Sequence, residues 1–271
     1  MSSIVVLDAC TIVNLARIDD GGFLENKVKT LKTYVVEKVL DEVRLHYAPS
    51  CNTDIKFLYQ VPYWGDLTRC DNADVEDHVS IVKTFLNYQK KPNGELYSTA
   101  LSLYLSRMEE EKVFFYTDDY PAIRDFKPFF EFQQVGYIGD SVDLLVFLYW
   151  LSPKGQFSKE ELKLYLTALR SEYASNLNNL RKKIDQYALK SCGSKRKIER
   201  KYKMEGLSSE LMSGQSLINT IEKCRRFFEE DHTTLGKEIN KILENFSSFP
   251  SIVEKIGKTI EYMDKFGIYK I

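Results

Sequence analysis

The sequence predicts an α/β protein, with a three-layer α/β/α parallel-sheet domain over residues 1–152 and an all-α region over residues 153–271. Short apolar runs alternate with helical patterns through the first part, which is typical of a parallel sheet covered by helices on both faces. Ser152-Pro153-Lys154-Gly155 is a turn signal. Beyond this turn the strand-like runs stop and only helical patterns remain. We therefore place the domain boundary at the turn.

Four short runs have the composition of buried strands, being rich in β-branched or aromatic residues. They cover residues 4–7, 33–36, 113–116 and, more briefly, 132–135. The last run is followed by Gly136-Tyr137-Ile138-Gly139 and by an apolar helix from Asp140. Residues 49–70 have a mixed pattern and support no assignment.

Helices are predicted between these strands from periodicity and from capping signals. Val75, Val79, Val82 and Leu86 are spaced as one apolar helical face. The side chain of Asn93 can cap the helix that follows it. Further helices are expected over residues 11–17, 37–46, 94–110 and 158–190, and then two or three more with breaks at 192–193, near 206, at 231–236 and near 250.

Composition and hydropathy exclude two classes of protein. Hydrophobic residues make up 44% of the chain and charged residues 28%, which is the balance of a globular protein rather than a disordered one. The longest apolar stretch, residues 142–151, is too short to span a bilayer. The N-terminus lacks the basic segment and the apolar length of a signal peptide. We expect a cytoplasmic protein that does not bind a membrane.

Several catalytic chemistries lack a signature in this chain. The five cysteines are scattered without a Cys-x-x-Cys pair, and the three histidines have no neighbouring soft ligand, so a zinc site or disulfide framework is not expected. No local motif marks a nucleophilic Ser or Cys. No glycine-rich phosphate loop follows the first strand, which disfavours a flavodoxin-like nucleotide binder. Carboxylates remain as the candidate catalytic groups.

Four acidic residues occupy places where side chains of a parallel sheet converge, because loops at the carboxyl ends of its strands open onto a shared crevice. Oxygen ligands of this kind suit Mg²⁺ or Mn²⁺. Taken singly, Glu95 could belong to the helix start and Asp119 could cap a helix, whereas an acid directly after a buried strand, Asp8, requires a partner. The four are Asp8 after the first strand, Glu42 in the helix after the second, Glu95 in the first turn after Asn93, and Asp119 after strand 113–116.

The same segments resemble, in order, those of the PIN-domain family of metal-dependent ribonucleases. IVVLDACTIVNL resembles the family's opening strand and helix, VVEKVLDEV its strand followed by Val-x-x-Glu, NGELYSTALSLYL its acid-led helix, and FFYTDDYPAIRDF its Thr-x-Asp segment. GYIGDSVDLLVFL resembles the last strand and helix of a subgroup. The resemblance covers residues 4–152 and implies a PIN-like nuclease domain, followed by a helical C-terminal extension.

Carried over by position, Asp8, Glu42, Glu95 and Asp119 match the family's catalytic, metal-binding acids. Thr117 matches the accompanying threonine, and Asp118 replaces Asp119 if the register shifts by one. Thr11 and Asn14 either orient water or phosphate or serve as ordinary helix residues. The chain departs from the family at Glu95, where many members have Asp, at Cys10, where a small polar residue is common, and in a longer 49–93 segment.

The resemblance implies an endoribonuclease that hydrolyses RNA phosphodiester bonds with Mg²⁺ or Mn²⁺ and metal-activated water. It also implies a role as the toxin of a toxin–antitoxin pair or as a defence nuclease, so that the partners are an RNA substrate and a protein partner or antitoxin. A homo-oligomer is left open. The alternatives are a catalytically inactive PIN-fold module for binding or scaffolding, and a DNA nuclease.

The C-terminal region carries the opposite charge from the rest of the chain. Residues 151–271 hold 23 basic and 16 acidic residues, whereas residues 1–150 hold 15 and 23. Its aromatic residues are expected in a core, and the region could dock a partner or cover the active site. Its basic stretch either contacts RNA phosphates or is a solvated helix face. That stretch comprises Lys195, Arg196, Lys197, Arg200, Lys201 and Lys203.

Overall fold

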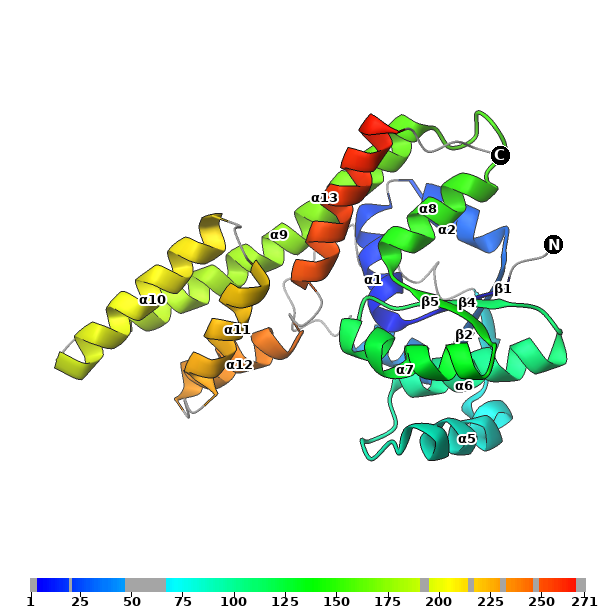
Figure 1. Ribbon diagram of the computed structural model, residues 1–271, viewed down its shortest axis with the longest axis horizontal. Helices are drawn as coiled ribbons and strands as arrows, with labels where there is room; N and C mark the ends of the chain where they lie inside the picture. Colours follow the sequence, from blue (N-terminus) through cyan, green and yellow to red (C-terminus); the bar gives the residue numbers. More distant parts are fainter. Residues whose placement is uncertain are drawn as a thin grey trace. The chain divides into compact units, whose positions relative to one another are not determined.

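The computed structural model describes residues 4–19, 21–46, 67–190, 195–213, 217–229, 233–245 and 249–266 (Figure 1). Its centre is a sheet of five strands, all parallel, in the order β3-β2-β1-β4-β5. The α/β class with a parallel sheet and a helical remainder is thus confirmed. The strands are β1 (Ile4–Leu7), β2 (Lys32–Val36), β3 (Thr68–Cys70), β4 (Val113–Tyr116) and β5 (Gly136–Gly139).

The strand order changes direction at β1. The chain moves from β1 to β2 and β3 on one side, and then returns to β4 and β5 on the other. Val6 pairs with Tyr34 on one side and with Phe115 on the other. The connections after β1 and β4 thus lead to opposite sides of the sheet, and in parallel sheets this is the place, at the carboxyl ends of the two strands, where a binding site is expected.

Helices cover both faces of the sheet. Figure 1 shows α1 and α8 on one side of the sheet, and α6 and α7 on the other. All four residues of β1 are completely buried, as expected for a strand covered on both faces. The helices of this part are α1 (Ala9–Ile18), α2 (Phe23–Lys29), α3 (Glu37–His46), α5 (Glu76–Leu86), α6 (Gly94–Met108), α7 (Tyr120–Phe132) and α8 (Ser141–Leu151), with a short 3₁₀ turn, η1 (Asn72–Val75).

Most predicted helices and strands are present, but the strand predicted over residues 132–135 is wrong. Helix α7 continues to Phe132 because Phe129 and Phe130 bury their rings in the core. Gln134 then turns the chain with a positive φ of 53°. The last strand starts at Gly136, where a Cβ would lie 2.0 Å from the carbonyl oxygen of Val113. Only glycine fits so close to the neighbouring strand.

Two segments were not assigned from the sequence. Helix α2 is only seven residues long, and its N-cap, Gly22, has a left-handed φ of 75°. Strand β3 has three residues, two of them exposed at the sheet edge. Part of the unassigned 49–70 segment lies outside the described residues. Such short elements lack the periodicity that sequence analysis requires.

The contacts divide the chain into two units, Met1–Leu169 with Lys258–Ile271, and Arg170–Gly257. The domain boundary that we expected after residue 152 stays a prediction. No helix in the described part of the chain is long and apolar enough to cross a membrane. The remaining helices are α9 (Lys159–Lys190), α10 (Lys195–Ser213), α11 (Leu217–Phe228), α12 (Thr234–Asn245) and α13 (Phe249–Lys265).

The second unit has a core of its own, in which Phe228 and Tyr187 form an edge-to-face ring pair. The expected break near Gly206 is wrong, because α10 continues through this exposed glycine between buried Met204 and Leu207. The core placement of Tyr262 and Phe266 is also wrong. These residues, which belong to the first unit, are four positions apart, pair with each other and remain more than 60% exposed.

Two phenylalanines of α7 provide a matched test of this core. Both rings lie against Phe85, but Phe129 is fully buried and Phe132 is 71% exposed. We expect Phe129→Ala to lower the free energy of unfolding by about 3–5 kcal/mol, because it leaves a cavity. Phe132→Ala should cost about 1 kcal/mol or less. Urea unfolding followed by circular dichroism measures both; equal losses would contradict the described packing of α7.

Candidate active site

The loops after β1 and β4 meet at the carboxyl ends of these two strands. The hydrogen bonding of the sheet extends into both loops. The amide of Asp8 donates to the carbonyl oxygen of Tyr116 at 3.0 Å. The amide of Thr117 donates to the carbonyl oxygen of Gly139 at 2.9 Å. The residues that follow β1 and β4 are therefore fixed by the sheet, as the sequence predicted for Asp8 and Thr117.

Asp8 is buried, and only one of its oxygens is satisfied. Its Oδ2 accepts hydrogen bonds from Thr117 Oγ1 at 2.9 Å and from Cys10 Sγ at 3.0 Å. Burial raises the pKa of the Cys10 thiol well above its usual value, so the thiol acts as a donor here. Asp8 Oδ1 has no hydrogen-bond partner within the described residues. A buried unpaired carboxylate oxygen is costly unless a cation or a proton satisfies it.

Glu42 reaches the site from α3 and is held by a glycine. The amide of Gly94 donates to Glu42 Oε1 at 2.9 Å. A Cβ on Gly94 would lie 2.5 Å from Glu42 Oε2 and 3.1 Å from a methyl carbon of Val39. The glycine before Glu95 is thus the residue that allows α3 and α6 to bring their acids to one place. The sequence predicted residue 94 only as the start of a helix, and this contact with Glu42 was not predicted.

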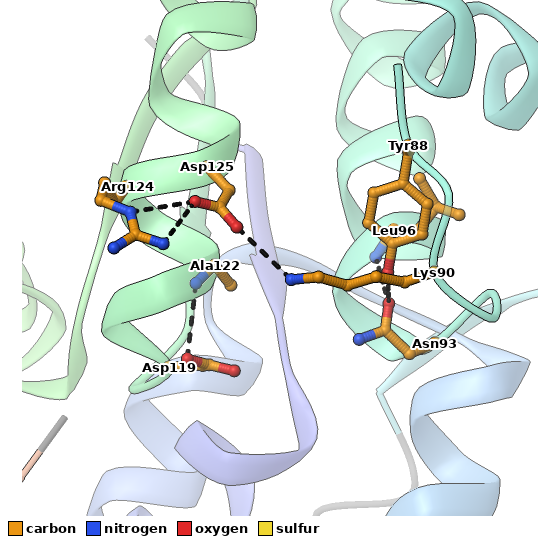
Figure 2. A network of polar contacts seen from close by, with 8 residues as sticks. All are labelled: Tyr88, Lys90, Asn93, Leu96, Asp119, Ala122, Arg124 and Asp125. Atoms are coloured by element: carbon orange, nitrogen blue, oxygen red, sulfur yellow. Dashed lines mark hydrogen bonds and ion pairs between the residues drawn. The ribbon is translucent and has the colours of Figure 1, made fainter. Parts of the chain in front are cut away.

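Glu95 stands in the first turn of α6, as predicted. The amide of Leu96 donates to Asn93 Oδ1 at 3.3 Å, which confirms Asn93 as the N-cap. The hydroxyl of Tyr88 donates to the same oxygen at 3.1 Å (Figure 2). Burial, followed by the charges of Asp8, Asp119 and Glu42, raises the pKa of Glu95 to about 9. Without a cation, Glu95 therefore keeps its proton at neutral pH.

Asp119 begins α7 as its N-cap. Its Oδ1 accepts from the amide of Ala122 at 3.4 Å, and its own amide donates to Thr117 Oγ1 at 3.2 Å. Burial raises the pKa of Asp119, while the hydrogen bond from Ala122 and the charges of Lys90 and Arg124 lower it. Asp119 thus caps α7 and also belongs to the acidic cluster, although we expected these roles as alternatives.

Asp118, the other aspartate of the pair, has a different position. Its Oδ1 accepts from the amide of Ser141 at 2.8 Å, and its Oδ2 accepts from Ser141 Oγ at 2.6 Å and from Asn14 Nδ2 at 2.7 Å. The carboxylate therefore joins the loop after β4 to α1 and to the start of α8. These bonds favour Asp119 over Asp118 as the site residue and give Asn14 a structural contact.

Electrostatic coupling shows that the four predicted acids come together. Burial is the largest cause of the raised pKa of Asp8, Glu42, Glu95 and Asp119. The charge of Asp8 further raises the pKa of both Glu42 and Glu95, and that of Asp119 raises the pKa of Asp8 and Glu95. Neighbouring carboxylates therefore oppose the ionisation of Asp8, Glu42 and Glu95, and a cation placed among them would be stabilised.

The donor set fits a hard divalent cation. It offers carboxylate oxygens, which Mg²⁺ and Mn²⁺ prefer, and one of them, Asp8 Oδ1, is buried without a partner in the described chain. Among the described residues, no three acidic, thiol or imidazole groups are arranged as a ready-made metal site. Binding would then require side-chain rotation, or ligands from water and substrate, which Mg²⁺ commonly keeps.

The remaining predicted residues differ in what the structure says of them. Thr11 is fully buried, and its hydroxyl has no partner among the described groups. The backbone of the basic stretch forms the first half of α10. Lys203 is exposed, and the side chains of Lys195, Arg196, Lys197, Arg200 and Lys201 lie outside the described residues.

Comparisons with protein-family models, curated proteins and solved structures find no match to this chain.

The raised pKa of Glu95 predicts a pH-dependent stability. Between the ordinary pKa of 4.5 and about 9, the folded state keeps a proton that the unfolded state releases. Raising the pH through this window therefore destabilises the folded state. In EDTA, we expect the wild-type urea midpoint to fall more between about pH 5 and about pH 8 than that of Glu95→Gln, which does not titrate. Exposed Glu131→Gln is the control, and parallel pH profiles for wild type and Glu95→Gln would refute the assignment.

Proposed function

We propose that this chain is a metal-dependent endoribonuclease with a PIN-like domain, which hydrolyses RNA phosphodiester bonds. The observation that carries the proposal is the acidic cluster at the carboxyl ends of β1 and β4, in which Asp8 has a buried oxygen without a hydrogen-bond partner among the described residues. RNA is proposed as the substrate because residues 4–152 resemble a family of ribonucleases; the motifs themselves do not separate RNA from DNA cleavage, so DNA is the alternative substrate. The same resemblance supports a biological role as a toxin with an antitoxin partner, or as a defence nuclease.

In this mechanism, Asp8, Glu42, Glu95 and Asp119 would hold Mg²⁺ or Mn²⁺. The bound ion would supply activated water and offset the negative charge that develops on the phosphate. Thr117 and Cys10 fix Asp8 by donating to its Oδ2, and the amide of Gly94 fixes Glu42. Burial and its acidic neighbours raise the pKa of Glu95, so this residue would have to give up a proton in order to serve as a ligand.

Cleavage of a mixed panel of RNA and single-stranded DNA in Mn²⁺, Mg²⁺ or EDTA tests this function. We expect RNA to be cut only with the metal. Asp8→Asn should reduce the rate by more than the roughly 10–100-fold cost of losing a partner of a metal ligand. Asp77→Asn, an exposed acid on α5, should retain the wild-type rate.

Each other result has a definite reading. Cutting that survives Asp8→Asn would mean a different site or a contaminating nuclease. Cutting of DNA alone would replace the proposed substrate. Folded protein that cuts neither polymer with either metal would favour a binding or scaffold module.

Gly94 provides a second test, because it contributes no functional group of its own. Gly94→Ala places a methyl group against Glu42 and Val39 and should displace the Glu42 carboxylate. We expect cleavage to fall by about 10–100-fold with the fold retained, the range seen when support for a metal ligand is lost. Gly206→Ala is the matched control, since a Cβ there meets nothing within 4 Å. Equal activity of the two variants would remove Glu42 from the mechanism.

A further inference from the structure

Two cationic side chains stand beside the acidic cluster and share one carboxylate. Lys90 lies between α5 and α6, and Arg124 lies in the second turn of α7. Lys90 Nζ is 3.5 Å from Asp125 Oδ2, and Arg124 donates from Nε and Nη2 to Asp125 Oδ1 at 3.0 and 2.9 Å. Figure 2 shows Asp125 between the two cations, with Asp119 at the start of the same helix.

The segment that carries Lys90 is held in place at several points. Asn87 ends α5 in the left-handed conformation, and the amide of Tyr88 donates to the carbonyl oxygen of Lys83 at 3.0 Å. The Tyr88 ring stacks on Phe126 of α7, with ring centroids 6.1 Å apart. Its hydroxyl bonds to Asn93, the cap of the helix that carries Glu95. Lys90 therefore emerges between two anchored residues next to the acids.

Both cations are accessible and carry excess positive charge. The side chains of Lys90 and Arg124 are 72% and 78% exposed, and within the part of the chain that the structure describes they share one anionic partner, Asp125. The Nη1 group of Arg124 has no hydrogen-bond partner within the described residues, so it can still donate. Asp119 is the N-cap of α7, and Arg124 and Asp125 lie in the second turn of the same helix. Lys90 contacts Asp125, and two residues before it Tyr88 bonds to the cap of the helix that carries Glu95. Both cations therefore lie beside the residues that carry the acidic cluster.

A nucleic acid that approaches four carboxylates needs positive charge outside the catalytic centre, since its phosphates are repelled by acids that a cation only partly offsets. We propose that Lys90 and Arg124 form a phosphate-binding edge, which holds the backbone of a single-stranded nucleic acid beside Asp119. This proposal rests on the proposed nuclease function and adds the path of the substrate strand over the protein surface. The strand runs from the acidic cluster over the α5–α6 connection and the first turns of α7.

The edge recognises a nucleic acid by the charge of its phosphates and not by the identity of its bases. Contacts to phosphates set the position of a strand but do not read its sequence. Asp125 keeps the two cationic ends at one place before the strand binds, which lowers the entropy lost when they engage a phosphate.

Salt-dependent binding tests the edge without requiring catalysis. The probe is fluorescently labelled oligouridine, bound to Asp8→Asn protein in EDTA and followed by anisotropy over a series of potassium chloride concentrations. We expect Lys90→Gln with Arg124→Gln to weaken binding and to reduce the slope of log K against log salt by about 0.7 per cation. Lys90→Arg with Arg124→Lys keeps both charges and should preserve the slope.

The matched control removes two positive charges from the opposite end of the sheet, where the strands begin. Lys32 and Lys112 lie at the amino ends of β2 and β4, so Lys32→Gln with Lys112→Gln should leave the slope unchanged. An unchanged slope for the Lys90 and Arg124 pair would overturn the edge, as would an equal loss in the control. Each variant's urea midpoint confirms folding. Because binding is measured without cleavage, a failed nuclease assay and a failed edge give separate results.

Discussion

Repulsion among partly or wholly buried carboxylates at the carboxyl ends of β1 and β4 is the constraint on which the rest of this site depends. The change in strand order at β1 places Asp8 and Asp119 at adjoining strand ends, and the helices α3 and α6 add Glu42 and Glu95. Each acid is partly or wholly removed from water, so each resists ionisation. Neighbouring carboxylates of the cluster make ionisation of Asp8, Glu42 and Glu95 harder still. Such a cluster destabilises the folded state unless neighbouring groups or a cation stabilise its carboxylates. The surrounding structure shows how neighbouring groups do so.

Compensation comes from hydrogen-bond donors that fix three of the four acids without neutralising them. Asp8 receives a hydroxyl and a thiol, Glu42 receives a backbone amide, and Asp119 receives an amide of its own helix. These bonds set the positions of the carboxylates while leaving much of their charge unbalanced. A site with this balance gains most from a divalent cation, which is the physical reason for preferring a metal-dependent reaction to one in which the acids only exchange protons.

The sequence predicted the sheet, its main helices and the four acids for a common reason. Buried parallel strands are continuous apolar runs, and acids directly after them or in a capped first turn are visible by position alone. The sequence did not predict the supporting residues. The contact of Gly94 with Glu42 joins positions 52 residues apart, and the bonds of Asp118 to Ser141 and Asn14 depend on how α1 and α8 pack. Long-range packing also decides that Phe132 ends a helix instead of starting a strand.

The two adjacent aspartates after β4 face different demands. Asp118 accepts hydrogen bonds from three donors on two helices, whereas Asp119 contributes to the acidic cluster. In a lineage that no longer needed cleavage, selection on Asp119 would relax first, because α7 can be capped equally well by Asn or Ser. Selection on Asp118 would persist as long as the protein had to fold. The order in which these neighbours vary among descendants would therefore record whether this architecture has been kept for its chemistry or only for its shape.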